Sequence, residues 1–390
     1  MPVKNRFAEL LPEITAWRRD FHENPELLYE VHRTAAKVAE LLRAFGVDEV
    51  TEGIGRTGVV GVIRGRNGGA GRVIGLRADM DALPITEKSG VGYASKVPGM
   101  MHACGHDGHT AMLLGAAKYL AETRNFDGTA VVIFQPAEEG GGGGKAMLDD
   151  GLVGRWGIDE FYGLHNMPGI PVGHFSIRPG AMMASADTVK ITLTGKGGHA
   201  AKPQQCIDTM LVAAQVIVAL QSVVSRNVNP LQSAVLSICT CQTDSPATNV
   251  IPQVVTLGGT VRTMDPAVRD LMEVRIRAVA TATAEAFGAT IEIDYDRGYP
   301  VTMNSVDETG HAVEVARSIS GATAVETQAE PMMGAEDFSY MLEERPGAYI
   351  FLGNGDTAAV HSPNYVFDDE AIPFGSSWLA GMVEARLGGA

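Results

Sequence analysis

The segment RVIGLRADMD, residues 72–81, indicates the fold class. It begins as an apolar strand and ends in two carboxylates, Asp79 and Asp81. Further strands of this kind alternate with helical patterns over residues 1–180, as expected when parallel strands are joined by helical crossovers. We therefore predict an α/β domain whose mostly parallel sheet is flanked by helices. The expected strands lie at 59–65, 72–77, 129–134 and 160–165, and the expected helices at 6–22, 29–46 and 107–123.

The pattern changes near residue 185. From there the order of expected elements is βαββαβ, which is typical of a ferredoxin-like α+β unit. After about residue 298 the α/β character returns, so the chain is expected to rejoin the first domain. We predict an α/β domain at 1–184 and 298–390 and an inserted α+β ferredoxin-like (βαββαβ) domain at 185–297. The strands expected after residue 185 are 186–194, 233–241, 254–262, 289–296 and 348–353, and the helices are 203–225, 266–287, 307–319, 336–343 and one from about 374.

Composition excludes several classes of partner. The formal net charge of -15 opposes binding to phosphate backbones and to anionic lipid, so we expect neither nucleic acid nor a membrane as a partner. The first 26 residues contain no apolar core of a signal peptide, which favours a cytoplasmic protein. The apolar run from Met210 to Leu220 is too short to span a bilayer and is expected to be a buried helix.

Cysteine usage predicts reduced thiols. Four cysteines in 390 residues require no disulfide in a reducing compartment. Cys239 and Cys241 alternate along one expected strand, so we predict that both pack on one face of it. Cys206, at the start of an expected helix, is also predicted to be structural.

Candidate ligands gather where the expected parallel strands end. Side chains at the carboxyl ends of such strands line the crevice in which α/β proteins build their sites. The groups present are a thiolate, imidazoles and carboxylates, which together suit divalent transition metals. The candidates are Cys104, His106, Glu138, Glu139, His165 and His361, whereas His22, His102, His109, His174 and His311 are expected to be structural or on the surface.

Two other interpretations of these residues remain open. Cys104 could be a nucleophile activated by a nearby histidine. Alternatively, the chain could be a binding module for a metal or an amino acid that performs no catalysis. A phosphate loop is excluded at Gly140–Lys145, because Glu139 and Ala146 occupy positions that the motif reserves for Gly and for Ser or Thr.

Six short motifs together give the chain a family resemblance. It resembles the hippurate hydrolase and indoleacetyl-amino-acid amidohydrolase family, which belongs to the aminoacylase and carboxypeptidase clan of metallohydrolases. The motifs keep the order and spacing of that family over nearly the whole chain. They are Cys104-Gly105-His106-Asp107, Glu138-Glu139, Gly163-Leu164-His165-Asn166, Gly197-Gly198-His199-Ala200, Gly334-Ala335-Glu336-Asp337-Phe338 and His361-Ser362-Pro363.

The resemblance implies a site with two divalent ions, which could be zinc, manganese, cobalt or nickel. Glu138 would be the general base, and Cys104 would bridge the ions. Asp79 and Asp81 stand where distant clan members have a His-x-Asp motif, so they are expected to orient the ligating imidazoles. The metal ligands implied are Cys104, His106, Glu139, His165 and His361.

The resemblance also implies a substrate and an assembly. The reaction expected is hydrolysis of the amide bond in N-acyl amino acids, such as hippurate-like, N-acetyl or indoleacetyl conjugates. A dipeptidase or carboxypeptidase of the same clan is the alternative. The inserted domain would form a homodimer or a higher homo-oligomer and deliver His199 to a neighbouring active site, while Asn249 and Arg262 would hold the substrate carboxylate.

Overall fold

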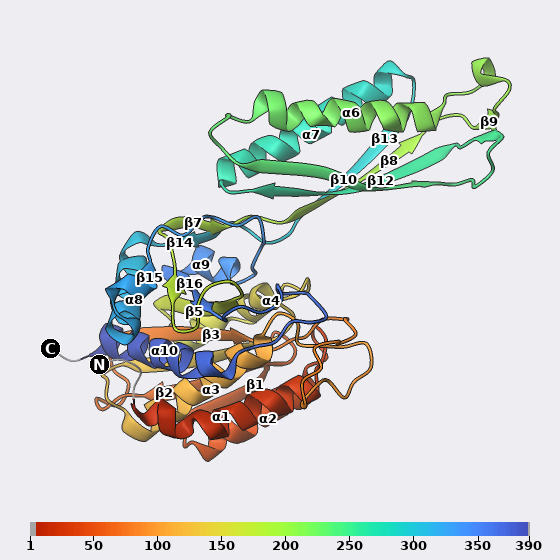
Figure 1. The fold of residues 1–390 in the computed structure, drawn as a ribbon. Helices are drawn as coiled ribbons and strands as arrows, with labels where there is room; N and C mark the ends of the chain where they lie inside the picture. The colour runs from red at the N-terminus through yellow and green to blue at the C-terminus, as the bar shows by residue number, and fades with distance from the viewer. Residues whose placement is uncertain (1–4, 389–390) are drawn as a thin grey trace. The chain divides into compact units, whose positions relative to one another are not determined.

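The computed structural model describes residues 5–388, and the chain forms two compact units (Figure 1). Unit 1 consists of residues 1–180, 303–330 and 337–390. Unit 2 consists of residues 181–302 and 331–336. The chain therefore leaves the first unit after residue 180 and returns after residue 302, and a second, short segment at 331–336 also belongs to unit 2. Two short strands, β7 (Gly180–Met183) and β14 (Thr302–Asn304), lie where the chain passes between the units.

An eight-stranded sheet forms the centre of unit 1 (Figure 1). The four central strands, β4, β3, β5 and β16, run parallel to one another. Nearly all of their residues are buried, as expected for parallel strands covered on both faces. The predicted α/β class with a mostly parallel sheet is confirmed. In spatial order the strands are β1 (Glu49–Ile54), β2 (Gly58–Arg64), β4 (Thr129–Gln135), β3 (Val73–Asp79), β5 (Glu160–Met167), β16 (Gly347–Gly353), β6 (Phe175–Ser176) and β15 (Val325–Glu326).

Helices cover both faces of this sheet. A Cβ added to Gly58 of β2 would contact Met147 of α4, whereas one added to Gly61 would contact Leu42 of α2. Residues three apart on a strand point to opposite faces, so α2 and α4 lie on opposite sides. The helices of unit 1 are α1 (Asn5–Glu23), α2 (His32–Ala44), α3 (His106–Thr123), α4 (Gly143–Asp149), α5 (Leu152–Trp156), α8 (Val306–Ser320), α9 (Ser339–Glu344) and α10 (Ile372–Leu387).

One edge of the sheet departs from the parallel pairing expected for residues 1–180. β1 and β2 pair antiparallel, and β2 pairs antiparallel with β4. Only three residues, 55–57, separate β1 from β2, and a connection this short can join antiparallel strands but not parallel ones. The strand β1, with its largely exposed side chains, was not predicted at all.

Unit 2 is a four-stranded antiparallel sheet with two helices (Figure 1). The spatial order β10-β12-β8-β13 and the chain order βαββαβ confirm the predicted ferredoxin-like arrangement. Residues of β8 alternate between buried and more exposed, so one face of the sheet packs against the helices. The elements are β8 (Asp187–Thr194), β9 (Gly198–His199), α6 (Thr209–Asn227), β10 (Ala234–Thr243), β11 (Val250–Ile251), β12 (Val254–Thr263), α7 (Pro266–Ala286) and β13 (Thr290–Arg297).

The first helix of unit 2, α6, starts later than the predicted residue 203. Asp208 is its N-cap, because the carboxylate accepts a hydrogen bond from the main-chain nitrogen of Leu211 at 3.1 Å. By length and composition alone α6 could cross a membrane, but core helices pass the same test. Val216, Leu220 and other residues of α6 are fully buried against the sheet. The predicted helix is therefore found, but only one of its faces is buried, because Met210, Leu211 and Val218 are exposed.

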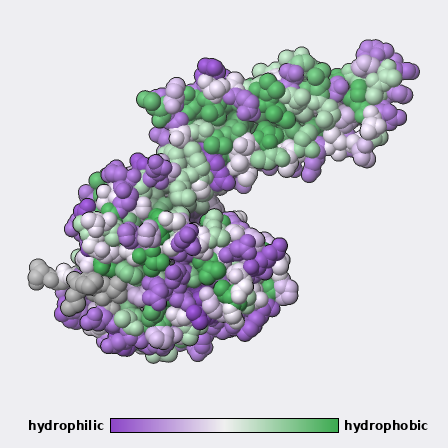
Figure 2. All heavy atoms as spheres, in the orientation of Figure 1, coloured by the Kyte–Doolittle hydropathy of each residue, from purple (hydrophilic) through white to green (hydrophobic). Residues whose placement is uncertain are grey.

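The prediction for Cys239 and Cys241 is wrong, since both are exposed on β10. The register of β10 against β12 shifts between Ile238 and Thr240, so Cys239 is the extra residue of a β-bulge. In addition, β10 is an edge strand whose second half is almost entirely exposed. On the face of unit 2 that Figure 2 shows, apolar residues cover a large area, and Leu231 before β10 is 93% exposed.

Candidate metal centre

The predicted ligands of unit 1 lie at the carboxyl ends of its central strands. β4 leads through a short turn to Glu138 and Glu139, and His165 lies near the end of β5. His106 is the first residue of α3, and Cys104 precedes it by two positions. His361 lies in the loop after β16. The parallel strands thus deliver these residues to one edge of the sheet, as is usual for α/β folds.

Two groups of potential metal ligands share one thiol. Cys104 forms one group with His106 and His165 and a second with Glu139 and His361, and within each group all ligand atoms lie within 4.8 Å of one another. Cys104 Sγ is 3.3 Å from His165 Nε2, and Glu139 Oε1 is 3.3 Å from His361 Nε2. The structure therefore brings together all five residues that the sequence suggested as ligands.

The imidazoles are oriented so that their Nε2 atoms face the cluster. His106 Nδ1 is 2.7 Å from the main-chain oxygen of Asp81, and His165 Nδ1 is 2.6 Å from that of Asn166. A carbonyl can only accept, so both Nδ1 atoms donate, and in the neutral form of each ring Nε2 keeps the lone pair that a metal would need. Within residues 5–388, the buried His106 Nε2 has no hydrogen-bond partner. Such imidazoles suit metal coordination.

Electrostatics also fit a divalent cation. Burial, together with nearby His109, holds the pKa of His165 well below its ordinary value, so this ring is neutral. Burial raises the pKa of the Cys104 thiol. Although burial opposes it, hydrogen bonding to His361 lowers the pKa of Glu139. A bound cation is the kind of partner that deprotonates a coordinating thiol.

Glu138 and Glu139 are placed by Asp81. The two carboxylate oxygens of Asp81 accept hydrogen bonds from the main-chain nitrogens of Glu138, at 2.9 Å, and Glu139, at 3.2 Å. Ala137 precedes them with φ 55°, a left-handed conformation that is uncommon for a residue other than glycine. Glu139 belongs to a group around Cys104, whereas Glu138 groups only with His106 and Glu139 among these ligands. The adjacent carboxylates are therefore not equivalent.

The glycine run at residues 140–144 follows these glutamates, and Gly143 packs closely against Pro136, which precedes them. A Cβ on Gly143 would lie 1.6 Å from the main-chain oxygen of Pro136, so no larger residue fits there. The glycine therefore allows the start of α4 to approach the main chain of Pro136 closely, a packing role that needs no phosphate.

No role at the site was predicted for His109. The structure shows that it contacts Asp79 and Asn166, which lie beside the predicted ligands. Its Nδ1 donates to Asp79 Oδ1 at 2.6 Å, and its Nε2 accepts from the main-chain nitrogen of Asn166 at 2.9 Å. Asp79 also accepts from Arg77 at 2.7 Å. The Asp79 carboxylate thus holds His109, which is not among the predicted ligands, and its second oxygen lies 3.6 Å from Nε2 of the predicted ligand His106. The spacing of His109 three residues after His106, on one helix face, was the available signal.

A network of buried charged side chains contacts Asp107, in the first turn of α3. His22 Nδ1 is 2.9 Å from Asp107 Oδ2, and His22 Nε2 is 3.2 Å from Glu87 Oε1. Arg18 lies 3.5 Å from the same oxygen of Asp107. Burial opposes a charge on the ring, but the two carboxylates raise the pKa of His22 from an ordinary 6.5 to about 9.

This network predicts a pH-dependent contribution to stability. Because the folded-state pKa of His22 exceeds the unfolded value, its contribution is fully present below pH 6.5 and is lost as pH rises through about 9. Urea unfolding of the wild type and His22→Gln should show a stability difference that shrinks by about 3 kcal/mol over that range. His32→Gln, at an exposed histidine of the same unit, is the control. A constant difference would contradict the prediction.

The candidate substrate residues of unit 2 lie near opposite ends of strand β12. His199 pairs with Val250 in a two-stranded ribbon, and Asn249 accepts a hydrogen bond from Ala200 there. Arg262 is the penultimate residue of β12, which begins at Val254 next to that ribbon. A strand of ten residues spans about 30 Å. Unit 2 therefore does not bring Arg262 together with His199 and Asn249.

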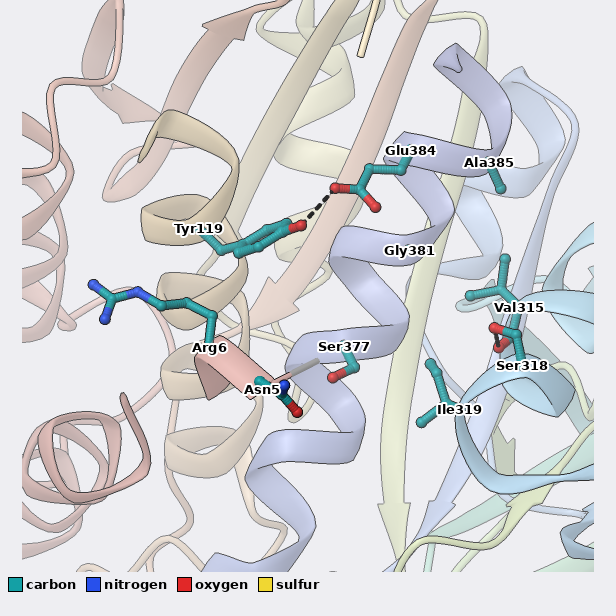
Figure 3. Close-up of a pocket in the computed structure, with 10 residues that line it drawn as sticks. All are labelled: Asn5, Arg6, Tyr119, Val315, Ser318, Ile319, Ser377, Gly381, Glu384 and Ala385. Atoms are coloured by element: carbon teal, nitrogen blue, oxygen red, sulfur yellow. Dashed lines mark hydrogen bonds between the residues drawn. The ribbon is translucent and has the colours of Figure 1, made fainter. Parts of the chain in front are cut away.

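A pocket elsewhere in unit 1 lacks the chemistry of a metal site. It has a volume of about 610 Å³ and lies among α1, α3, α8 and α10 (Figure 3). Tyr119 donates to Glu384 at 2.8 Å within it. Its ten described lining residues include neither cysteine nor histidine. The ligand cluster around Cys104 is the better candidate.

Fold and site together define a metal-dependent amidohydrolase. Residues 75–385 match the family model described as peptidase family M20/M25/M40, and the chain belongs to that family. It is 44% identical to the hippurate hydrolase of Campylobacter jejuni, with 95% of this chain and 96% of that protein covered. It is 40% identical to thermostable carboxypeptidase 2 of Saccharolobus solfataricus, with 96% and 95% covered.

A solved structure agrees with this membership. It is described as a dinuclear metal binding peptidase of the M20 family from Bacillus subtilis. The similarity has a TM-score of 0.85 at 34% sequence identity, covering 97% of this chain and 99% of that one. The family predicted from the sequence motifs is thus confirmed.

Proposed function

We propose that this protein hydrolyses the amide bond of N-acyl amino acids. The observation that carries the proposal is the buried Glu138, which Asp81 fixes beside the ligand cluster and which lies outside both groups centred on Cys104. A carboxylate in that place can serve as an acid and base, whereas a module that only binds has no use for it. The relative named hippurate hydrolase supports an N-acyl amino acid as the substrate.

The site is proposed to hold two divalent ions, which could be zinc, manganese, cobalt or nickel. His106 and His165 would bind one ion and Glu139 and His361 the other, with Cys104 shared between them. When bound, such a pair of ions lowers the pKa of a water molecule and polarises a carbonyl.

The chain's own residues would then move the proton. Glu138 takes it from the attacking water and passes it to the amide nitrogen that departs, so that the carboxylate is regenerated. His199 would donate a hydrogen bond to the oxygen that becomes negative when water adds to the carbonyl. Assigning the nucleophile to water leaves Cys104 free to act as a ligand and gives Glu139, His165 and His361 a role.

Asn249 and Arg262 are proposed to bind the substrate carboxylate. A guanidinium pairs well with a carboxylate through two hydrogen bonds. Since β12 separates Arg262 from His199 and Asn249 by about 30 Å, these residues would act on one substrate only if two copies of the chain contribute. A homodimer formed by unit 2 would supply the second copy, and the exposed apolar residues Val218 and Leu231 of this unit support that assembly.

The compartment in which the protein is proposed to act is the cytoplasm.

A carboxypeptidase or dipeptidase is the second candidate, favoured by the relative named thermostable carboxypeptidase 2. A hydrolysis panel of N-acetyl, N-benzoyl and indoleacetyl amino acids alongside dipeptides, after loading with zinc, manganese, cobalt or nickel, separates the two. We expect faster turnover of the acyl amino acids. Faster cleavage of dipeptides would reverse the assignment.

Metal removal provides a direct test of the site. Elemental analysis of carefully prepared protein is expected to show up to two transition-metal ions per chain. Treatment with a chelator should abolish amidase activity, and adding metal back should restore it, because the water needs the acidity that the ions supply. Full activity after removal of the metal would contradict the proposal and would favour a Cys104 nucleophile.

Substitution of Arg262 tests the proposed carboxylate contact. Arg262→Ala is expected to lower kcat/KM much more for substrates with a free carboxylate than for the matching carboxamides, because only the former can pair with the guanidinium. Measuring kcat/KM for both substrates provides the internal control. An equal loss for the two classes would indicate that Arg262 is structural.

A further inference from the structure

One buried side chain beside the cluster, Asn166, contacts two of the other three segments that carry ligands. It follows His165 directly on β5. Its Nδ2 donates to the main-chain oxygen of Cys104 at 2.6 Å. Its Oδ1 accepts from the hydroxyl of Tyr365 at 2.7 Å, and Tyr365 lies four residues after His361 in the same loop. A single amide therefore links the segments of Cys104, His165 and His361.

The contact is tightly packed. Gly105 has φ 89°, and a Cβ there would lie 2.3 Å from Asn166 Nδ2 and 2.5 Å from the Tyr365 hydroxyl. Any larger residue would push the chain after Cys104 away from both groups. Tyr365 is fully buried, and Asn166 is as well. A second link, from the main-chain nitrogen of His361 to the oxygen of Ala103 at 2.7 Å, joins the same two loops.

The chemistry of the amide fixes its orientation. The oxygen of Cys104 can only accept a hydrogen bond, so the Asn166 nitrogen must face it. The Asn166 oxygen then faces Tyr365, whose hydroxyl can donate. A flipped amide would place two acceptors against each other at Cys104. The three groups therefore form one directed chain of hydrogen bonds, from Tyr365 through Asn166 to Cys104.

We infer that Asn166 and Tyr365 are positioning residues that hold the Cys104 thiol in register with His165 and His361. The inference rests on the ligand set of the proposed function. Metal ligands must be held within about 0.5 Å of their productive positions. Cys104 lies in a loop, directly before Gly105, whose backbone is left-handed. Without the Tyr365 hydroxyl, the His361 loop loses its link through Asn166 to the main chain of Cys104.

Cobalt(II) binding tests this inference, because a cysteine ligand gives a sulfur-to-cobalt charge-transfer band in the near ultraviolet. Tyr365→Phe removes only the hydroxyl. The matched control is Tyr162→Phe, since Tyr162 is also fully buried in unit 1 and donates to Glu160 at 2.8 Å. Metal-free proteins are compared by thermal unfolding, and cobalt is titrated into each.

Tyr365→Phe is expected to bind cobalt about 10–100-fold more weakly than the wild type and to show an altered charge-transfer band, as is typical when a partner of a ligand is lost. Tyr162→Phe should lose comparable thermal stability but keep the wild-type affinity and band. If Tyr365→Phe does not fold, Asn166→Ser serves as the second variant, with the same expectation.

The possible results distinguish a wrong ligand set from a wrong role for Asn166 and Tyr365. A wild-type protein without the charge-transfer band would refute Cys104 as a ligand and, with it, the inference. A wild-type band that Tyr365→Phe and Asn166→Ser leave unchanged in position, strength and affinity would overturn the inference alone. An equal loss of cobalt affinity in Tyr162→Phe would also overturn it, because the effect would then be one of general stability.

Discussion

Glu138→Gln is expected to lower kcat by about 10²–10⁴-fold while the metal content stays at the wild-type level. Glutamine has nearly the same size, and the bond from the main-chain nitrogen of residue 138 to Asp81 does not involve the side chain that changes. The variant therefore keeps the turn but loses the group that accepts a proton. Steady-state kinetics together with elemental analysis of the same preparation measure both properties.

Glu139→Gln is the matched comparison, because it alters the neighbouring residue in the same way. Its carboxylate belongs to a group with Cys104 and His361, so this variant should lose metal. Activity should then recover, at least in part, when a large excess of metal is added, whereas Glu138→Gln should not respond. If both variants lose metal and activity equally, the division of roles between the two carboxylates is wrong.

Much of the fold could be predicted because its central strands are mostly apolar. β3, β4 and β5 are buried on both faces, and such runs stand out between helices of period 3.6. β1 was missed because its side chains are mostly exposed and show no apolar run. The bulge at Cys239 was missed for a related reason, since a shift of register depends on the partner strand and not on the local sequence.

The ligand cluster could also be anticipated, because Glu139, His165 and His361 lie near or beyond the ends of strands that must meet at one sheet edge, and Cys104 and His106 lie at the start of a helix. The residues around it were harder to find. Asp81 acts through both its main-chain oxygen and its carboxylate, and it contacts two different segments. Tyr365 and Asn166 are 199 positions apart and meet only after the C-terminal part of the chain has returned to unit 1. Such contacts depend on tertiary packing, which periodicity does not encode.

We expect His199 to act across a subunit boundary. The hydrogen bond that its Nδ1 accepts leaves Nε2 as the atom that can donate one. The main-chain nitrogen of Ala201 donates to His199 Nδ1 at 3.1 Å. A neutral imidazole whose Nδ1 accepts must carry its proton on Nε2, so the exposed ring presents a donor. Donation to a developing oxyanion contributes about 2.7–4 kcal/mol in other enzymes, so His199→Ala should lower kcat by about 10²–10³-fold.

Mixing two inactive variants tests the role across subunits. In a heterodimer of His199→Ala and Glu138→Gln subunits, one active site receives an intact Glu138 from one chain and an intact His199 from the other. With equal amounts and random exchange, half of the dimers are mixed and each holds one intact site, so about a quarter of wild-type activity should return. His199→Ala mixed with a subunit carrying both substitutions is the control and should stay inactive. If subunit exchange is demonstrated and no activity returns, His199 does not act in the partner's site.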